Sequence, residues 1–80
     1  MKLEVLIYLY KEALKRYVES CLLKERGFNQ GYIAGEFRTL DMILCETVGR
    51  TLFKEIEMNS IKEVSEQLNT TCEVINKIIY

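Results

Sequence analysis

Two stretches of the chain decide its fold: residues 2–26, KLEVLIYLYKEALKRYVESCLLKER, and residues 32–57, YIAGEFRTLDMILCETVGRTLFKEIE. In the first stretch, apolar residues recur at alternating steps of four and three, the spacing that gathers side chains on one stripe of a helix. The stripe contains Leu3, Ile7, Tyr10, Leu14, Tyr17 and Cys21. Gly27 suits a left-handed helix cap, and residues 27–31 make a short turn. The sequence therefore predicts a long antiparallel helical hairpin over residues 1–57.

The second stretch is apolar on two sides when it is drawn as one continuous helix. The inner stripe, which would meet the first helix, contains Ile33, Phe37, Leu40, Leu44 and Val48. Roughly opposite lie Gly35, Met42, Gly49 and Phe53, with Cys45 beside them. A glycine inside a helix costs about 1 kcal/mol relative to alanine, which favours the close approach of another backbone at this second face. We therefore predict that these five residues form a protein interface.

A second copy of the chain is the expected partner for that interface. Gly35 and Phe53 are separated by about 27 Å along a continuous helix, whereas each short C-terminal helix would span only about 14 Å. A homodimer accounts for the whole length of the face. The alternative is that residues 58–80 cover one end of the face and that the rest is ordinary exposed surface.

Residues 58–80 carry the start signals of two short helices. Ser60-Ile61-Lys62-Glu63 and Thr70-Thr71-Cys72-Glu73 both fit the capping box, in which a hydroxyl and a glutamate bond to the free amides at the start of a helix. Asn69 stands in the tight turn between them, where it could adopt the left-handed conformation usually given to glycine. The pattern is helix-turn-helix-like.

The predicted fold class is all-α, with a single domain over residues 1–80. A helical hairpin, residues 1–57, is followed by a short helix pair, residues 58–80. We expect the pair to pack against the open end of the hairpin, where Val5, Tyr8 and Leu9 would otherwise be exposed.

A helix-turn-helix pair can also bind DNA, with its second helix in the major groove. The residues that this helix would present are Thr71, Cys72, Glu73, Asn76 and Lys77. Asn76 suits adenine, and Lys77 suits guanine or phosphate. Charge argues against this function, because residues 58–80 carry two lysines against three glutamates, whereas duplex binding draws most of its affinity from basic residues. The alternative for the pair is a structural role in completing the core or an interface.

Composition argues against several other function classes. The chain contains no histidine, the usual general base near neutral pH, and no glycine-rich phosphate loop. Three widely spaced cysteines, Cys21, Cys45 and Cys72, predict neither a disulfide framework nor a zinc site. The apolar run from Val5 to Tyr10 is too short for a signal peptide or a membrane span. We expect a cytoplasmic, non-enzymatic protein that needs no metal or cofactor and does not associate with membranes.

The favoured function is a small helical protein-interaction module that associates with itself. The net charge of −1 does not indicate a strongly acidic or basic partner. The alternative function is a dimeric helix-turn-helix DNA-binding regulator that uses residues 60–80.

Overall fold

The computed structural model describes residues 2–23 and 28–80, with the backbone alone for residues 28–30. The described residues form helices α1 (Leu3–Leu22), α2 (Phe28–Val48), α3 (Arg50–Gln67) and α4 (Cys72–Ile79), and they contain no strand. The predicted all-α class is therefore confirmed. The predicted helix cap at Gly27 lies outside the described residues, and α2 begins at Phe28, four residues earlier than the sequence pattern indicated.

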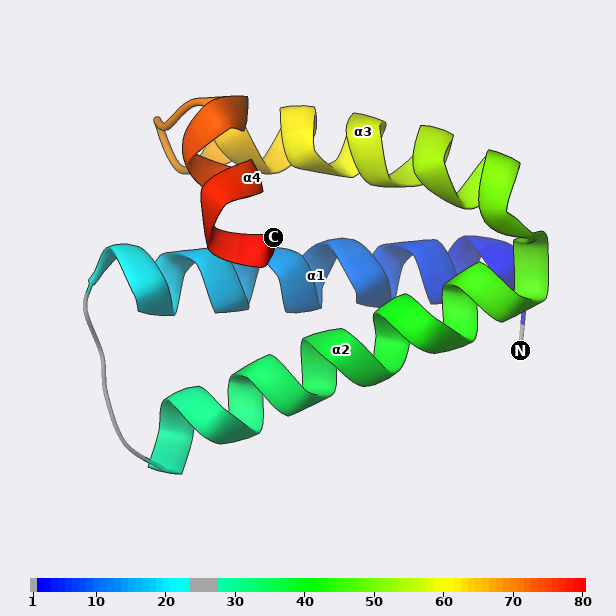
Figure 1. The fold of residues 1–80 in the computed structure, drawn as a ribbon, viewed down its shortest axis with the longest axis horizontal. Coiled ribbons are helices and arrows are strands. Elements are labelled where there is room, and N and C mark those ends of the chain that lie inside the picture. The colour runs from blue at the N-terminus through cyan, green and yellow to red at the C-terminus, as the bar shows by residue number, and fades with distance from the viewer. Residues whose placement is uncertain (1, 24–27) are drawn as a thin grey trace.

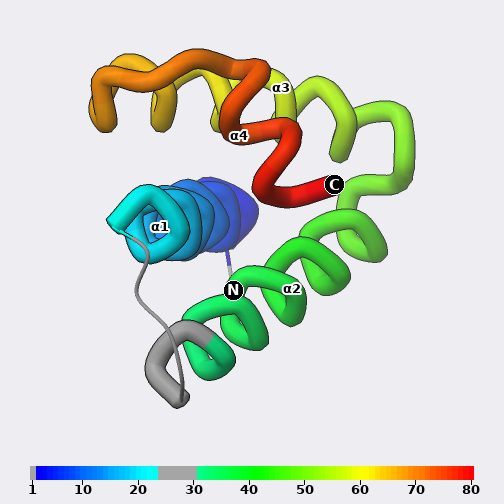
Figure 2. Tube along the Cα trace, turned by 60° about the vertical axis from the view of Figure 1, so that its left-hand side comes forward, coloured from blue at the N-terminus to red at the C-terminus, as the bar shows by residue number. Residues whose placement is uncertain are grey.

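Helix α1 is the central element of the molecule and packs against all three other helices. Helices α2 and α3 run along two sides of it, and α4 folds back from the end of α3 towards α1 (Figure 1). A view closer to the axis of α1 shows α3, α4 and α2 arranged around one side of this helix (Figure 2). Most of the apolar stripe of α1 is therefore covered, although Leu3 at its start is 41% exposed.

Helix α2 ends at Val48 and α3 begins at Arg50, so the predicted continuous helix from Tyr32 to Glu57 is wrong. Gly49 stands between them with φ 87° and ψ 162°, a conformation that is essentially confined to glycine because it has no Cβ. The Gly49 N–H still donates to the Cys45 carbonyl, and the Gly49 carbonyl accepts from the Phe53 N–H. One residue thus ends α2 and starts α3.

Helix α3 continues to Gln67, so the predicted helix start at Ser60 is also wrong. Ser60 is buried, and its hydroxyl donates to the Ile56 carbonyl at 2.7 Å. A serine inside a helix can satisfy its hydroxyl in this way, so the same residue type does not require a helix start. The chain after α2 is therefore one long helix and one short helix, not two short ones.

The predicted start of the last helix is confirmed with a shift of one residue. Thr71 is the N-terminal cap of α4, and its hydroxyl accepts from the Val74 N–H at 3.3 Å. The predicted cap was Thr70. Asn69 has a φ of 57°, the left-handed conformation expected for the turn. The turn between α3 and α4 is thus as tight as the sequence indicated.

Aromatic rings from three helices meet at the centre of the core. The Tyr10 ring centroid lies 5.6 Å from that of Phe37 in α2 and 5.9 Å from that of Phe53 in α3, while Tyr17 stacks on Phe37 at 5.4 Å. These are separations at which aromatic pairs add stability beyond the area they bury. The apolar residues of the core are Leu6, Tyr10, Ala13, Leu14, Val18, Phe37, Leu44, Phe53, Ile61, Val64, Ile75 and Ile79.

Helix α4 completes this core without covering the N-terminal half of α1. Ile75 and Ile79 are buried, whereas Val5 and Tyr8 remain 45% and 61% exposed. The predicted role of the C-terminal residues in covering Val5 and Tyr8 is therefore wrong. The physical reason is that α3 is long, so α4 begins beyond the far end of α3 and folds onto another part of α1 (Figure 1).

Candidate interaction surface

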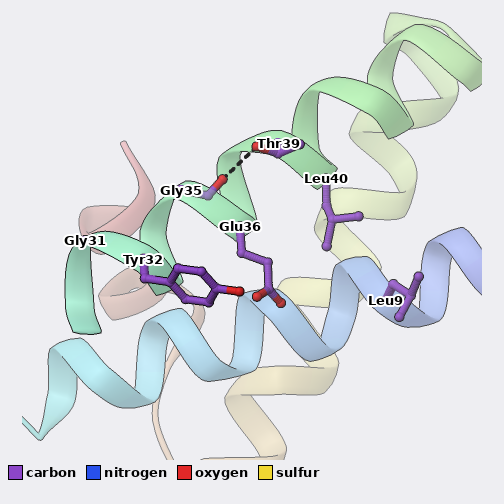
Figure 3. Close-up of a pocket in the computed structure, with 7 residues that line it drawn as sticks. All are labelled: Leu9, Gly31, Tyr32, Gly35, Glu36, Thr39 and Leu40. Carbon is purple, nitrogen blue, oxygen red and sulfur yellow. Dashed lines mark hydrogen bonds between the residues drawn. The ribbon is translucent and has the colours of Figure 1, made fainter. Parts of the chain in front are cut away.

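An apolar groove of about 610 Å³ runs between α1 and α2 on the open side of the bundle. Leu9 contributes from α1 and Leu40 from α2, and the rest of the lining comes from the exposed side of α2 (Figure 3). The lining residues are Leu9, Gly31, Tyr32, Gly35, Glu36, Thr39 and Leu40. The Thr39 hydroxyl is satisfied within the helix, because it donates to the Gly35 carbonyl at 2.9 Å. The groove therefore offers few free polar groups.

The apolar surface continues beyond the groove along both helices. Val5 lies one turn before Leu9 in α1, and Ile43 lies about one turn after Leu40 in α2, so each extends the same side of its helix. Their exposed fractions are 45% and 44%. On the outer side of α2, Tyr32 and Met42 are 68% and 60% exposed. We call Val5, Leu9, Tyr32, Gly35, Thr39, Leu40, Met42 and Ile43 the α1–α2 face.

An ion pair between α1 and α2 borders this face. Arg16 and Glu36 approach to 3.2 Å, and both side chains remain partly exposed. Because the two charges neutralise each other, the pair lowers the net charge at the edge of the groove. An exposed pair of this kind contributes at most about 1 kcal/mol to stability, so its main effect is to leave the neighbouring surface apolar and uncharged.

The five residues that the sequence predicted as one interface lie in three different places in the structure. Gly35 and Met42 lie on the α1–α2 face and are exposed. Cys45 is half-buried against the core, and Phe53 is buried within it. Gly49 is the junction between α2 and α3, and nothing lies within 4 Å of the position that a Cβ would occupy there or at Gly35. The predicted close contact of backbones is therefore absent within the described chain.

The pattern missed Tyr32 and Ile43 because it gave weight to a continuous stripe through Gly49 and Phe53. The break at Gly49 ends the helical register, so residues after it no longer belong to the stripe that Gly35 and Met42 define. Tyr32 and Ile43 could have been found by following the exposed side of α2 alone. Tyr32 lies three residues before Gly35, and Ile43 lies four residues after Thr39 and three after Leu40, so each neighbours a residue of the face on the helix surface.

The five residues predicted for DNA contact are all exposed. Thr71 caps α4, while Cys72, Glu73, Asn76 and Lys77 lie within it. The Cys72 thiol contacts the Ser65 hydroxyl at 3.8 Å, which ties the start of α4 to α3. The described structure thus presents these side chains together, with one lysine and one glutamate among them.

A polar cluster that the sequence analysis did not identify lies where α4 closes on the bundle. Glu57 in α3 is buried and accepts a hydrogen bond from the Tyr80 hydroxyl. The Tyr10 hydroxyl from α1 is also buried and has no hydrogen-bond partner among the described residues. Asp41 contributes from α2, close enough to affect the pKa of both tyrosines. We call Tyr10, Asp41, Glu57 and Tyr80 the polar cluster.

The ionisation of this cluster is shifted by burial and by its own negative charge. Burial and then Glu57 raise the pKa of Asp41, while Arg38 lowers it. Burial and the hydrogen bond to Glu57 raise the pKa of Tyr80 to about 12. Burial raises the pKa of Tyr10 well above the ordinary range. Both tyrosines are therefore neutral donors at physiological pH.

Arg38 is a cation near the cluster, and its hydrogen bond goes elsewhere. Its guanidinium donates to the Ile79 carbonyl at 2.8 Å and lies 5.4 Å from the centre of the Phe37 ring and 6.0 Å from that of Tyr17. A cation is favourable at the C-terminal end of a helix and over an aromatic face. Arg38 thereby joins α2 to the end of α4.

Comparison with known protein families, with curated proteins and with solved structures found no match to this chain. Among the described residues, no group of three or more acidic or cysteine side chains is placed to hold a metal ion. None of the helices within the described part of the chain has the length and apolar character needed to cross a membrane.

Proposed function

We propose that this protein is a non-enzymatic helical interaction module that forms a homodimer through the α1–α2 face. The observation that carries the proposal is the groove between α1 and α2 together with its exposed apolar extension at Tyr32, Met42 and Ile43. The largest apolar patch on a typical monomeric protein covers about 300–600 Å² and is often a functional site, and larger patches mark interaction sites. A cytoplasmic location, inferred from the odd number of cysteines, belongs to the same proposal.

The area of the face matches what one protomer contributes to a stable dimer. Its apolar side chains expose on the order of 450 Å² together, if a fully exposed large side chain presents about 200 Å². A standard interface buries about 800 Å² per partner, of which about 57% is apolar, or roughly 450 Å². The whole chain also exposes 5601 Å², whereas a monomeric protein of this mass is expected to expose about 5,000 Å².

A second copy fits the face better than a strongly charged partner would. The charged residue that lines the groove is Glu36, and it is paired with Arg16 within one chain. A symmetric dimer brings identical patches together, so the apolar side chains of the face meet their own kind while Glu36 stays paired with Arg16. Gly35 would allow the second helix to approach closely at this point.

Two matched methionine substitutions test the proposal. Met42→Glu places two carboxylates at the proposed interface, which should weaken dimerisation at least tenfold because like charges across an interface cost several kcal/mol. Met58→Glu makes the same chemical change in α3, where Met58 is 69% exposed and lies outside the face. The measurement is the dimer dissociation constant by analytical ultracentrifugation. A monomeric wild-type chain at tens of micromolar, or equal effects of the two variants, would contradict the proposal.

The second candidate function is DNA binding by α4. It is favoured by the exposure of Asn76 and Lys77 on one short helix that begins at a well-formed cap, and it is opposed by the net negative charge of residues 58–80. Lys77→Ala should then weaken binding to all duplexes and reduce the salt slope by about one unit, while Asn76→Ala should relax base preference. The control in a mobility-shift titration is Lys54→Ala, which removes an exposed lysine from α3, away from α4. Equal binding by Lys77→Ala and Lys54→Ala would exclude this function.

A further inference from the structure

One exposed apolar side chain of α2 stands on the same side of the helix as the groove but outside it. Met42 is 60% exposed and does not line the groove, whereas Gly35 does. The two residues are seven positions apart in one helix, so they lie about two turns and about 10.5 Å apart along the same line. Nothing lies within 4 Å of the position that a Cβ would occupy at Gly35. This line therefore has a protruding side chain at one point and a notch at another.

The relative direction of two copies decides what the protruding side chain meets. If the two α2 helices run parallel about a two-fold axis, each residue meets its own copy, so Met42 meets Met42 and the notch at Gly35 meets another notch. If the helices run antiparallel and the axis lies midway between Gly35 and Met42, each Met42 lies over the Gly35 of the other copy. Methionine is unbranched and flexible, so it fills irregular apolar gaps. Close packing therefore favours the antiparallel arrangement, which occupies both grooves.

We propose that the two copies pair through antiparallel α2 helices and that Met42 of each copy completes the groove of the other. This inference rests on the proposed dimerisation through the α1–α2 face and adds the residue that the second copy contributes. A second copy is the occupant because the exposed apolar area of the face matches one protomer's share of a standard interface. Leu9 on α1 and Leu40 on α2 border the groove and give it apolar walls (Figure 3).

The charged residues beside this line favour the same direction. Glu46 is exposed one turn after Met42, so parallel helices would bring two Glu46 carboxylates together, and like charges across an interface repel. In the antiparallel arrangement Glu46 lies opposite Tyr32 of the second copy, whose hydroxyl can donate to a carboxylate. Arg38 lies close to the two-fold axis, but its guanidinium is turned towards α4 by its hydrogen bond to the Ile79 carbonyl. The antiparallel arrangement thus places no pair of like charges directly opposite each other.

A double-mutant cycle on the dimer dissociation constant tests the contact between positions 35 and 42. Met42→Ala removes the protruding side chain, and Gly35→Met fills the notch, so each should weaken dimerisation at least about tenfold. In the double variant the new methionine can enter the space left at position 42 of the other copy. The combined loss should therefore be at least about threefold smaller than the product of the two single effects. Strictly multiplicative effects would overturn the proposed contact.

Disulfide trapping tests the direction of the helices. The background chain, whose dimer is first measured by ultracentrifugation, carries Cys21→Ala, Cys45→Ala and Cys72→Ala. Gly35→Cys and Met42→Cys chains, one of them with a mass tag, are mixed and mildly oxidised. In the antiparallel dimer the two positions 35 are about 10 Å apart along the helices, beyond the Cα separation of about 4.4–6.8 Å that a disulfide bridges. The control replaces Met42→Cys by Thr47→Cys, because Thr47 is exposed in α2 outside the α1–α2 face.

The expected product is a mixed disulfide between position 35 of one copy and position 42 of the other, with little crosslinking of either variant to itself and none in the control. A dimer in which Gly35→Cys copies crosslink to each other, or in which positions 35 and 42 do not crosslink, would overturn the antiparallel arrangement and leave dimerisation intact. A background chain that is monomeric at tens of micromolar would instead contradict the proposed function. The two failures are therefore distinguishable.

Discussion

Replacing Gly49 by alanine tests the junction that separates α2 from α3. At φ 87° and ψ 162°, a residue with a Cβ is strained by about 1–3 kcal/mol, wherever the neighbouring atoms lie. Nothing lies within 4 Å of the added Cβ, so the cost is conformational and is not relieved by movement of a neighbour. We expect Gly49→Ala to lower the free energy of unfolding by about 2 kcal/mol, which for a domain of this size lowers Tm by roughly 8–16 °C.

Gly35→Ala is the matched control because the same atom is added inside α2. Gly35 lies within α2, and nothing lies within 4 Å of the position of the added Cβ. Alanine should therefore stabilise the fold by about 0.4–1 kcal/mol. Thermal and urea unfolding should be compared for both variants at a concentration where the chain is monomeric. If both substitutions stabilised the fold, the break between α2 and α3 at Gly49 would be refuted. Alanine favours a helix, and stabilisation at both positions would indicate one uninterrupted helix from Tyr32 to Glu57.

Three further predictions concern α4 and the chemistry of the chain. Ile75→Ala should lower the free energy of unfolding in urea by about 2–5 kcal/mol, because Ile75 is fully buried. Arg38→Ala should lower the free energy of unfolding by about 1–2 kcal/mol, because it removes the hydrogen bond to α4. Arg16→Ala is the control: it breaks an exposed ion pair and should lower the free energy of unfolding by less than about 1 kcal/mol in the same assay. A metal chelator should leave Tm unchanged, and a fall of several degrees would indicate a structural metal.

The helices of this protein follow from residue spacing wherever one apolar stripe decides the burial of a helix. Tyr10 and Leu14 were placed on the inner stripe of α1, and both are completely buried. The turn at Asn69 was predicted from its tolerance of the left-handed conformation, which it adopts. These features depend on local chemistry, so a single sequence contains enough information to predict them.

The junction at Gly49 could not be predicted in the same way. Gly35 and Gly49 both stand among residues that are compatible with a helix, and what distinguishes them is the tertiary packing that turns α3 back across α1. Glu57 lies in the interior, between the core residues Phe53 and Ile61 one turn away on either side. The polar cluster therefore depends on a backbone turn that the pattern of residues does not reveal.

The candidate surface was predicted in part for the same reason. Gly35 and Met42, predicted on the side of α2 opposite the inner stripe, lie on an exposed side of that helix, and their place in an interface stays a prediction. Phe53 was assigned to that side by counting through Gly49, and it is in the core. A homodimer and a DNA-binding role for α4 both stay predictions.

The central position of α1 has a consequence for the order in which the protein can be made. The stripe of α1 leaves the ribosome first, but its cover includes Ile75 and Ile79, which belong to the last helix of the described chain. At about 5–20 residues per second, the 57 residues between Leu22 and Ile79 take roughly 3–11 s to synthesise. During that interval Tyr10, Leu14 and Val18 are incompletely covered, so apolar surface stays exposed on the nascent chain until α4 has been made.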